Sequence, residues 1–355
     1  MKKNSKIFIA GHKGLVGSVI YKNLLQQGFE NIIVAEKSSL DLRNQAQINN
    51  FFAIHKPEFV ILAAGKVGGI IANSTYKAEF IYDNLMIAAN IINAAKEYGI
   101  KKLLNLGSSC IFPKQATIPI KEEYLLTGAL EATNEPYAIA KIAAIKLCRY
   151  YNEQYGTDFI SVMPNNLYGI NDNYNFETSH VLPALIRKNI IAKALSENNF
   201  DLILKDSKLH KIGFGLDDNN NNNIDLILNK YSQLGITSNE ITLWGTGNVY
   251  REFLFNEDLA EACIFLMQNY SANEIGEFIN VGYGTDITIK EVTNIIRDIV
   301  GYNGSIKFDS SKPDGTYRKL MDTSRINNLG WKPNTNLETG IKIVVDGYYN
   351  KLKEL

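Results

Sequence analysis

A serine, a tyrosine and a lysine occur in two short stretches whose residue types could reduce a carbonyl group. Ser108 follows the apolar run 103–106, and Tyr137 and Lys141 stand four positions apart in an alanine-rich stretch. A helix would place Tyr137 and Lys141 on one face, where the ammonium would favour the phenolate and lower the pKa of the tyrosine. Tyr137 would then donate a proton to a carbonyl oxygen held by Ser108, while a cofactor supplies hydride.

Cys110 stands two residues after Ser108 and could act on a C–H bond beside the same carbonyl. If the backbone stays extended past the apolar run, side chains two apart point the same way, so one substrate would meet both. A thiolate can remove a proton that a neighbouring ketone has made acidic. Each feature also has a plainer interpretation: a small buried cysteine, and a tyrosine at the core edge near a solvated lysine. Only their combination with the elements around them favours chemistry.

The elements that must position these residues alternate between strands and helices. The apolar run 6–10 leads into a glycine turn, a helical pattern to residue 25 and a second strand at 32–35, and further strands are expected at 59–65, 103–106 and 159–163. This pattern predicts an α/β protein with a Rossmann-type, doubly wound parallel sheet and sites at the carboxyl ends of its strands. We expect a dinucleotide-binding domain over 1–165, with a core extending into later segments. A smaller C-terminal α/β part, 166–355, would bind substrate.

The glycine turn has the form GxxGxxG, with Gly11, Gly14 and Gly17. Glycines let the backbone approach a pyrophosphate, and the following helix offers free N–H groups and a positive dipole end. Such turns also serve plain packing, but their position between a strand and a helix favours cofactor binding.

The residues after the second strand would bind the adenosine end of the cofactor. Glu36 there would bond a ribose 2′-hydroxyl and favour NAD, whereas Lys13 and Lys37 could pair with a 2′-phosphate and favour NADP. The residues alone leave this choice open. Asp41, followed by Leu42, could contact the adenine edge or could instead cap a helix that starts near Arg43.

Composition excludes several classes of function. Lysine plus arginine equals aspartate plus glutamate, 37 each, so no global basic field points to nucleic acid. The three cysteines are sparse and odd in number, which favours a reducing compartment over a disulfide framework. No apolar stretch reaches about eighteen residues, so we expect a cytoplasmic protein without a membrane partner. The asparagine run 219–223 lacks the carboxylate spacing of a calcium loop, so no metal is expected.

Five stretches together resemble one family. They are LGSSCIFPK at 106–114, NEPYAIAK at 134–141, MPNNLYG at 163–169, SHVLPALIRK at 179–188 and SKPDG at 311–315. With the glycine turn, they resemble the GDP-L-fucose synthases of the extended short-chain dehydrogenase/reductase superfamily. The likeness covers nearly the whole chain except roughly 195–240.

The resemblance implies a two-stage reaction on GDP-4-keto-6-deoxy-mannose, with epimerisation at C3 and C5 followed by NADPH-dependent reduction at C4. It implies Ser108, Tyr137 and Lys141 for reduction, and Cys110 and His180 for epimerisation. The family reads the 2′-phosphate with basic residues at the positions of Lys13 and Lys37, which favours NADP(H).

The expected contacts can be given as two sets. Cofactor contacts are expected from Gly11, Lys13, Gly14, Leu15, Val16, Gly17, Lys37, Asp41, Leu42, Ala63, Ala64, Tyr137, Lys141, Asn165, Leu167 and His180. Contacts with the GDP-sugar substrate are expected from Ser109, Asn166, Arg187, Lys188, Trp244, Arg251 and Asp314. The family also implies a homodimer through two long helices, around 80–98 and 136–155.

The exception to the resemblance is an insertion at about 197–240. Its apolar runs at 202–204 and 224–228 predict a strand or 3₁₀ piece and a helix, and its asparagine run predicts a mobile loop. Because it lies between His180 and Trp244, the insertion could lid the sugar pocket. It could equally form an oligomer contact or be neutral decoration.

Two other functions remain open from the sequence. The protein could be a C4-reductase only, acting on a GDP-4-keto-6-deoxy-heptose in surface polysaccharide biosynthesis; the insertion motivates that alternative. It could also be a non-catalytic nucleotide-binding module, although intact Ser108, Tyr137 and Lys141 speak against that.

Overall fold

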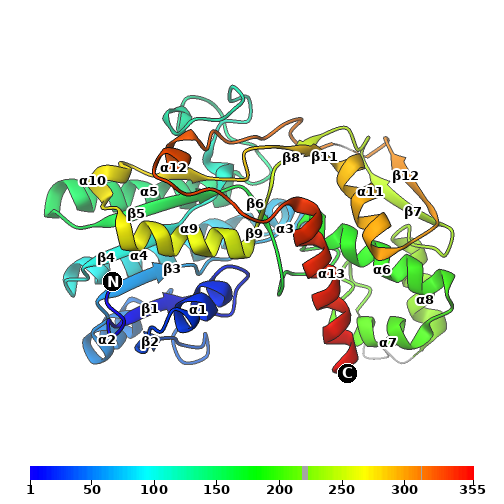
Figure 1. Cartoon of the computed structure of the whole chain (residues 1–355), viewed down its shortest axis with the longest axis horizontal. Coiled ribbons are helices and arrows are strands. Elements are labelled where there is room, and N and C mark those ends of the chain that lie inside the picture. The colour runs from blue at the N-terminus through cyan, green and yellow to red at the C-terminus, as the bar shows by residue number, and fades with distance from the viewer. Residues whose placement is uncertain (218–222, 313) are drawn as a thin grey trace.

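A computed structural model of the chain describes residues 1–217, 223–312 and 314–355 (Figure 1). Most of the asparagine run, for which a mobile loop was predicted, and Pro313 of the fifth family stretch lie outside the described residues.

A six-stranded parallel sheet forms the centre of the larger lobe. Its strands run in the order β10-β5-β4-β3-β1-β2, and every neighbouring pair is parallel. The strands are β1 (Ile7–Ala10), β2 (Ile32–Ile33), β3 (Phe59–Leu62), β4 (Lys102–Leu106), β5 (Phe159–Pro164) and β10 (Ile279–Val281). The order of the strands reverses between β1 and β3, which is where ligands bind in open α/β sheets.

Helices cover both faces of this sheet, and the strand residues explain how. Ile7 and Ile9 of β1 pack in one hydrophobic cluster, while Phe8 and Ala10 pack in another on the opposite face, as the period-two geometry of a strand requires. The first cluster includes α1 (Gly17–Gln26), α9 (Asn256–Asn269), α10 (Ala272–Ile275) and α12 (Ser324–Asn328); the second includes α2 (Gln45–His55), α4 (Lys77–Glu97) and α5 (Glu135–Tyr155). The predicted doubly wound Rossmann-type fold is confirmed.

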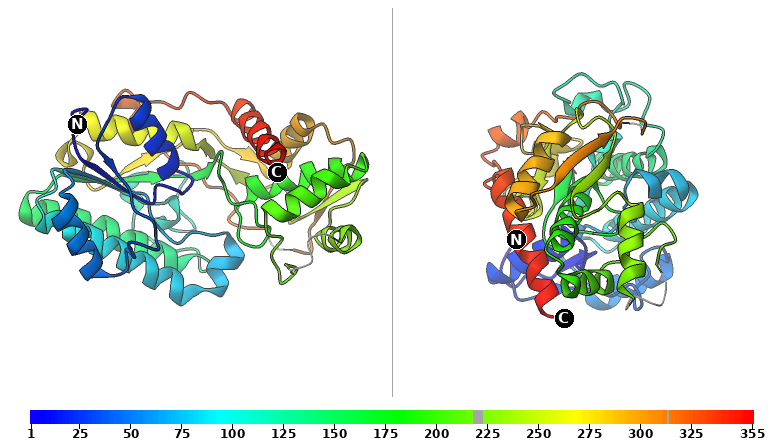
Figure 2. Two further views of the ribbon diagram at one scale, coloured as in Figure 1. Left: turned by 90° about the horizontal axis from the view of Figure 1, so that it is seen from below. Right: turned by 90° about the vertical axis from the view of Figure 1, so that its right-hand side faces the viewer.

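The smaller lobe lies beyond one end of the sheet, at the right of Figure 1, and Figure 2 shows the two lobes side by side. Three two-stranded sheets pair β7 (Glu240–Trp244) with β12 (Ser305–Asp309), β8 (Tyr250–Arg251) with β11 (Ile287–Thr288), and β6 (Asn166–Tyr168) with β9 (Phe253–Phe255). The helices of this lobe are α6 (Val181–Ser196), α7 (Phe200–Leu209), α8 (Ile224–Gln233), α11 (Ile289–Val300) and α13 (Leu337–Lys353). The short α3 (Ile70–Thr75) and two 3₁₀ turns, η1 (Ser109–Ile111) and η2 (Glu122–Tyr124), complete the chain as described.

The described parts of the insertion, 197–217 and 223–240, contain two helices, α7 and α8. The run 202–204, predicted as a strand or 3₁₀ piece, lies inside α7; that prediction is wrong, because the Asn199 side chain accepts from the Leu202 N–H and starts a helix there. The predicted helix at 224–228 is confirmed as α8, which Asn223 caps in the same way. Both helices pack in the core of the smaller lobe, where α7 also contacts α6 and α13.

No helix in the described part of the chain is long and apolar enough to span a bilayer.

Candidate active site

The glycine turn after β1 is shaped partly by packing and partly by open space. Gly11 has a φ of +91°, and a Cβ on it would lie 2.7 Å from the Ala64 nitrogen; a Cβ on Gly17 would lie 2.2 Å from the Gly11 oxygen. These two glycines are needed for the turn to pack against itself and the end of β3. A Cβ on Gly14 would meet only the Gly11 oxygen, at 3.4 Å. Its bare backbone therefore leaves room for a pyrophosphate at the strand-order reversal, and the turn fits a dinucleotide.

The adenosine end of this turn carries both signs of charge. Lys13 Nζ lies 2.6 Å from Glu36 Oε1, and His12 Nε2 lies 3.5 Å from the same oxygen. The hydrogen bond from Lys13 lowers the pKa of Glu36 below its usual range. Lys37 is exposed beside it. The carboxylate that would favour NAD is thus already paired with one of the lysines that would bind a 2′-phosphate.

Asp41 holds Arg43 and does not cap a helix. It accepts from the Arg43 backbone N–H at 3.0 Å and from the guanidinium at 2.8 and 3.0 Å, and these bonds lower its pKa to about 2. Helix α2 instead begins at Gln45, with the Asn44 side chain accepting from the Gln47 N–H. The capping alternative for Asp41 is therefore wrong.

The two stretches predicted to form one site do meet. Tyr137 and Lys141 lie on one face of α5, and Lys141 Nζ donates to the Leu106 carbonyl, at the end of β4, over 2.7 Å. The same ammonium lies 5.7 Å from the centre of the Tyr137 ring. The Ser108 hydroxyl, two residues past Leu106, lies within hydrogen-bond reach of the Tyr137 phenol.

The structure contradicts the predicted effect of Lys141 on Tyr137. Burial and the neighbouring Cys110 raise the pKa of Tyr137 above its usual range, against the opposing hydrogen bond with Ser108. Burial also lowers the pKa of Lys141 to about 8, and its ammonium is directed at the Leu106 carbonyl. Tyr137 is consequently held as a neutral phenol, which is the form that donates a proton.

The backbone turns immediately after Ser108. Ser108 itself is extended, with φ −163° and ψ 147°, but residues 109–111 form η1, so the expected extended path through Cys110 is wrong. Cys110 nevertheless stays next to Ser108, because the Cys110 N–H donates to Ser108 Oγ at 3.4 Å.

Cys110 is buried beside two ammonium groups. Burial raises the pKa of its thiol, while Lys319, the Ser108 hydroxyl and Lys141 act in the opposite direction by favouring the thiolate. The sequence reasoning missed Lys319, since it lies far along the chain from Cys110 and no spacing pattern marks it. Together with Lys141, Lys319 can balance negative charge on the sulfur.

A buried polar network ties the cysteine turn to the second lobe. Ser109 Oγ donates to Asn165 Oδ1 at 3.2 Å, and the Asn165 amide donates to the fully buried Glu252. Glu252 Oε2 also accepts from the Met321 N–H at 3.0 Å, and the Asn166 amide donates to the Glu252 carbonyl at 3.0 Å. Ser109, Asn165 and Asn166, all expected to contact ligands, are therefore also structural. Glu252 was not among the predicted site residues. The sequence predicted a role for its neighbour Arg251, but no pattern marks Glu252 itself.

The remaining predicted cofactor residues follow the strands β1, β2 and β3 or lie in β6. Ala63 and Ala64 follow β3 against Gly11, and Leu167 lies half-buried in β6. Leu15 and Val16 lie in the turn that opens α1, and Leu42 receives the Asn90 amide on its carbonyl at 3.1 Å.

His180 approaches from the second lobe. It occupies the N-cap position of α6, and although part of its surface is open to solvent, the protein atoms packed around it lower the pKa of its imidazole by desolvation. The segment before it reaches back to the first lobe, since the Gly69 N–H donates to the Thr178 carbonyl at 2.9 Å. Within the described ranges, no hydrogen bond joins the His180 side chain to Ser108, Cys110 or Tyr137. The imidazole is neutral near pH 7 and can take a proton or give its N–H.

Three predicted substrate residues, Trp244, Arg251 and Asp314, are linked to one another through hydrogen bonds with residues 246 and 316. Trp244, at the end of β7, is 60% exposed, and Lys312 Nζ lies 5.6 Å from its ring centre. Asp314 accepts from the Thr246 N–H at 2.9 Å and from its hydroxyl at 2.7 Å, which fixes the turn after Trp244. The Arg251 guanidinium donates to the Thr316 carbonyl at 2.7 Å, close to the same turn.

Arg187 and Lys188 are adjacent in α6 but have different environments. Arg187 is fully buried and bonded to Asp206 of the insertion and to backbone carbonyls, so the predicted contact between Arg187 and the substrate is wrong. Lys188 is half-buried, its Nζ donates to the carbonyls of Leu234 and Thr242 at 2.9 and 3.2 Å, and burial lowers its pKa to about 8.

Comparison with known proteins gives one family. The model of the NAD dependent epimerase/dehydratase family matches residues 7–202 and 212–282. GDP-L-fucose synthase 1 of Arabidopsis thaliana is 46% identical over 98% of this chain and 94% of its own length. Among solved structures, a GDP-6-OMe-4-keto-L-xylo-heptose reductase from Campylobacter jejuni is 41% identical, with a TM-score of 0.92 over 99% of each chain.

A GDP-mannoheptose C4 reductase from the same organism, solved with NADP bound, is also 41% identical, with a TM-score of 0.86 over 98% of this chain and 99% of that one. These matches agree with the glycine turn and with the Ser108, Tyr137 and Lys141 cluster. The chain belongs to the NAD dependent epimerase/dehydratase family and, within it, to the family of the GDP-L-fucose synthases.

Proposed function

We propose that the protein reduces the C4 carbonyl of a GDP-4-keto-6-deoxy sugar with NADPH. The observation that carries this proposal is the meeting of Ser108, Tyr137 and Lys141 at the carboxyl end of β4, next to a glycine turn with room for a pyrophosphate. Relatives whose names specify GDP-L-fucose synthesis and GDP-heptose reduction support the substrate class.

The chemistry of reduction divides between cofactor and chain. NADPH, when bound, supplies the hydride to C4. Ser108 holds the carbonyl oxygen, and Tyr137, kept neutral by burial, gives that oxygen its proton. Lys141 supplies positive charge next to the phenol as it loses the proton, because its ammonium is already fixed by the Leu106 carbonyl.

Epimerisation at C3 and C5 is part of the same proposal. A ketone at C4 acidifies both neighbouring C–H bonds, Cys110 removes a proton from one face of the sugar, and His180 returns one to the other face. Support comes from the burial of Cys110 beside Lys319 and Lys141 and from the neutral imidazole of His180. Each cycle moves one proton off and one proton on, so no external reductant is needed for this stage.

The remaining substrate contacts follow from charge and exposure. Lys188 and Arg251 supply positive charge for the diphosphate, and the exposed Trp244 ring offers a face for guanine or sugar. Asp314 fixes the turn that presents Trp244.

A GDP-4-keto-6-deoxy-heptose is the second candidate substrate. The heptose reductases of C. jejuni match this chain with TM-scores of 0.92 and 0.86. Incubation with NADPH or NADH and a panel of GDP-4-keto hexoses and heptoses tests the proposal. NADPH consumption with one member supports it, and no consumption with any member would overturn it.

We further propose a homodimer in a reducing compartment. Helices α4 and α5 pack side by side and expose Tyr82, Ile139 and Tyr150, at 59, 41 and 52%, which suits a self-complementary interface. The three cysteines are all free and buried. Mass photometry of Tyr82→Asp combined with Tyr150→Asp should show monomers, and Tyr317→Asp, at a tyrosine that is 67% exposed outside these helices, is the control. A dimer in the double variant would contradict the proposed interface.

A further inference from the structure

We propose that the described parts of the insertion, 197–217 and 223–240, form a brace that positions His180 for proton transfer. This inference rests on the proposed epimerisation. The brace acts on residues 174–179, the segment that leads into α6 and ends next to His180.

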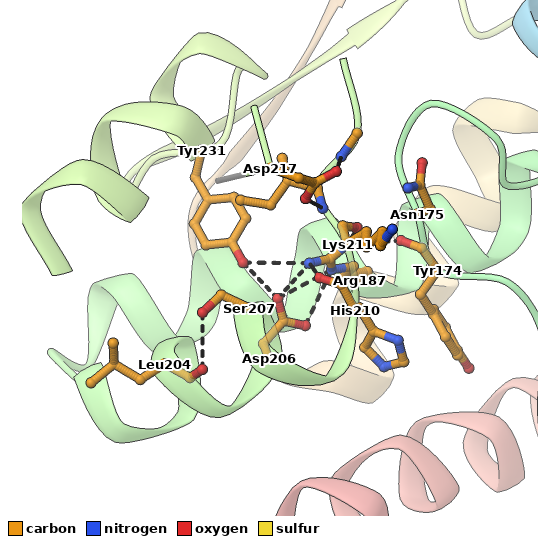
Figure 3. A network of polar contacts seen from close by, with 12 residues as sticks. Tyr174, Asn175, Arg187, Leu204, Asp206, Ser207, His210, Lys211, Asp217 and Tyr231 are labelled. Carbon is orange, nitrogen blue, oxygen red and sulfur yellow. Dashed lines mark hydrogen bonds and ion pairs between the residues drawn. The ribbon is translucent and has the colours of Figure 1, made fainter. Parts of the chain in front are cut away.

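The centre of the brace is a buried ion pair. The Arg187 guanidinium contacts Asp206 of α7 at 2.7 and 3.2 Å, and both side chains are fully buried. The remaining N–H groups of Arg187 donate to the carbonyls of Tyr174, Lys211 and His210 at 2.8, 2.7 and 2.9 Å. Arg187 therefore bonds helix α7, the chain that follows it, and the start of segment 174–179 at once (Figure 3).

Two more helices, α8 and α13, donate hydrogen bonds to the Asp206 carboxylate. Tyr231 of α8 donates to Asp206 Oδ2 at 2.6 Å, and Tyr348 of α13 donates to Oδ1. Four donor atoms from three side chains, Arg187, Tyr231 and Tyr348, thus surround a carboxylate that has no water-exposed surface. Such a fully satisfied buried network holds one arrangement of its elements, so the insertion is fixed to α6 and to the C-terminal helix.

Side chains of segment 174–177 pack against the insertion and against Arg187 of α6. The Tyr174 ring lies 4.9 Å from the His210 ring, and the Phe176 ring lies 4.4 Å from the Arg187 guanidinium. Glu177 accepts from the Phe214 N–H at 2.7 Å. The turn that presents this N–H is itself closed by Asp217, which accepts from the N–H groups of Ile212 and Gly213 at 2.7 and 3.0 Å.

The opposite side of the segment contacts the first lobe. Besides the bond from Gly69 to Thr178, a Cβ on Gly69 would lie 2.5 Å from the Ser179 carbonyl oxygen, and one on Gly68 would lie 3.2 Å from the Phe80 ring. Phe80 packs edge-on against Tyr137, with 6.4 Å between ring centres. The segment is therefore held between the insertion and the lobe that carries the reductive residues, and the insertion sets where His180 stands.

The brace predicts a separation of two activities. Ser108, Tyr137 and Lys141 are bound to β4 and α5, so loosening the insertion leaves their geometry in place. His180 loses its fixed position. Proton exchange at C3 and C5 should then fall, while hydride transfer at C4 should not.

The test uses surface contacts of the brace, which can be removed without emptying the buried ion pair. Glu177→Ala and Asp217→Ala are compared with Asp201→Ala, an exposed carboxylate of α7 whose only described partner is Lys205 on the next turn. Two rates are measured on the full chain: wash-in of solvent deuterium at C3 and C5, and oxidation at C4 of the reduced GDP-sugar by NADP⁺. The second rate does not depend on epimerisation.

We expect Glu177→Ala and Asp217→Ala to lower the exchange rate at least about tenfold, as misplacement of a catalytic group does, with C4 oxidation unchanged. Glu177→Gln, which keeps an acceptor for the Phe214 N–H, should restore exchange, and Asp201→Ala should match the wild type. Unchanged exchange in both alanine variants, or parallel loss of both rates, would overturn the brace. Absence of exchange in the wild type itself would instead overturn the proposed epimerisation.

Discussion

Ser108 follows β4, Tyr137 and Lys141 lie on α5, and the two elements are joined here by a bond from Lys141 to the strand carbonyl of Leu106. His180 lies at the start of α6 in the other lobe, behind a segment held by an inserted helical pair. The first group is positioned by the parallel sheet and by the helix that packs on it. The second depends on contacts between α6 and the insertion. The reductive and the epimerising parts of the site can therefore be disturbed separately.

The largest expected effect comes from a substitution in the reductive part of the site. Tyr137→Phe removes the proton donor to the C4 oxygen, so NADPH-linked reduction should fall by about a hundred- to ten-thousandfold. Deuterium wash-in at C3 and C5 should persist, because it does not need this phenol. Tyr150→Phe, on the same helix but exposed, is the matched control. Reduction by Tyr137→Phe at the wild-type rate would rule out the proposed donor.

The next largest effect comes from a substitution in the buried ion pair between α6 and the insertion. Asp206→Asn leaves the fully buried Arg187 without its counter-charge, so the free energy of unfolding should drop by about 3–5 kcal/mol. Urea denaturation of this variant and of Asp201→Asn, whose carboxylate is exposed, measures it. Equal stabilities for the two variants would show that the pair does not hold the insertion.

The pH dependence of proton exchange at C3 and C5 tests the second region, because the exchange rate should change by about tenfold per pH unit. Burial raises the pKa of Cys110, and below that pKa each pH unit gives about ten times more thiolate. Exchange at C3 and C5 should therefore rise from pH 7 to 9, and Cys110→Ser should abolish it. NADP⁺-linked oxidation of the product by Cys110→Ser should remain. Exchange that is flat over this range would mean that the thiol is not the base.

The smallest expected effect concerns substrate binding. Lys188 carries its charge below its pKa of about 8 and loses it above that pH. The KM for the GDP-sugar should therefore rise by up to about tenfold between pH 7 and 9, because the charged fraction of Lys188 that can bind the diphosphate falls by about that factor. Lys188→Arg, which stays charged, should flatten the profile, and a KM that still rises in that variant would assign the effect elsewhere.

Sequence patterns predicted the fold well because they report local rules. The continuous apolar run 6–10 reflects a strand, β1, that is buried on both faces, and the Tyr137 and Lys141 spacing reflects one face of α5. The glycine turn was equally readable, since Gly11 and Gly17 have no space for a side chain.

The errors concern burial and partners distant in sequence. Arg187 and Lys188 are adjacent, and only the insertion decides that Arg187 faces Asp206 while Lys188 stays half-buried. The raised pKa of Tyr137 follows from desolvation that a spacing cannot report. Lys319 and Glu252 reach the site from parts of the chain without a motif of their own. The turn at 109–111 likewise depends on the Ser108 side chain capping it.

One measurement tests the division between the two regions most directly. The protein is incubated in deuterium oxide with protonated NADPH and the GDP-4-keto-6-deoxy sugar that it consumes, and the product is examined by NMR. The account predicts deuterium at C3 and C5, placed by Cys110 and His180, and protium at C4, delivered by the cofactor. Deuterium at C4, or a reduced product with protium at all three carbons, would contradict it.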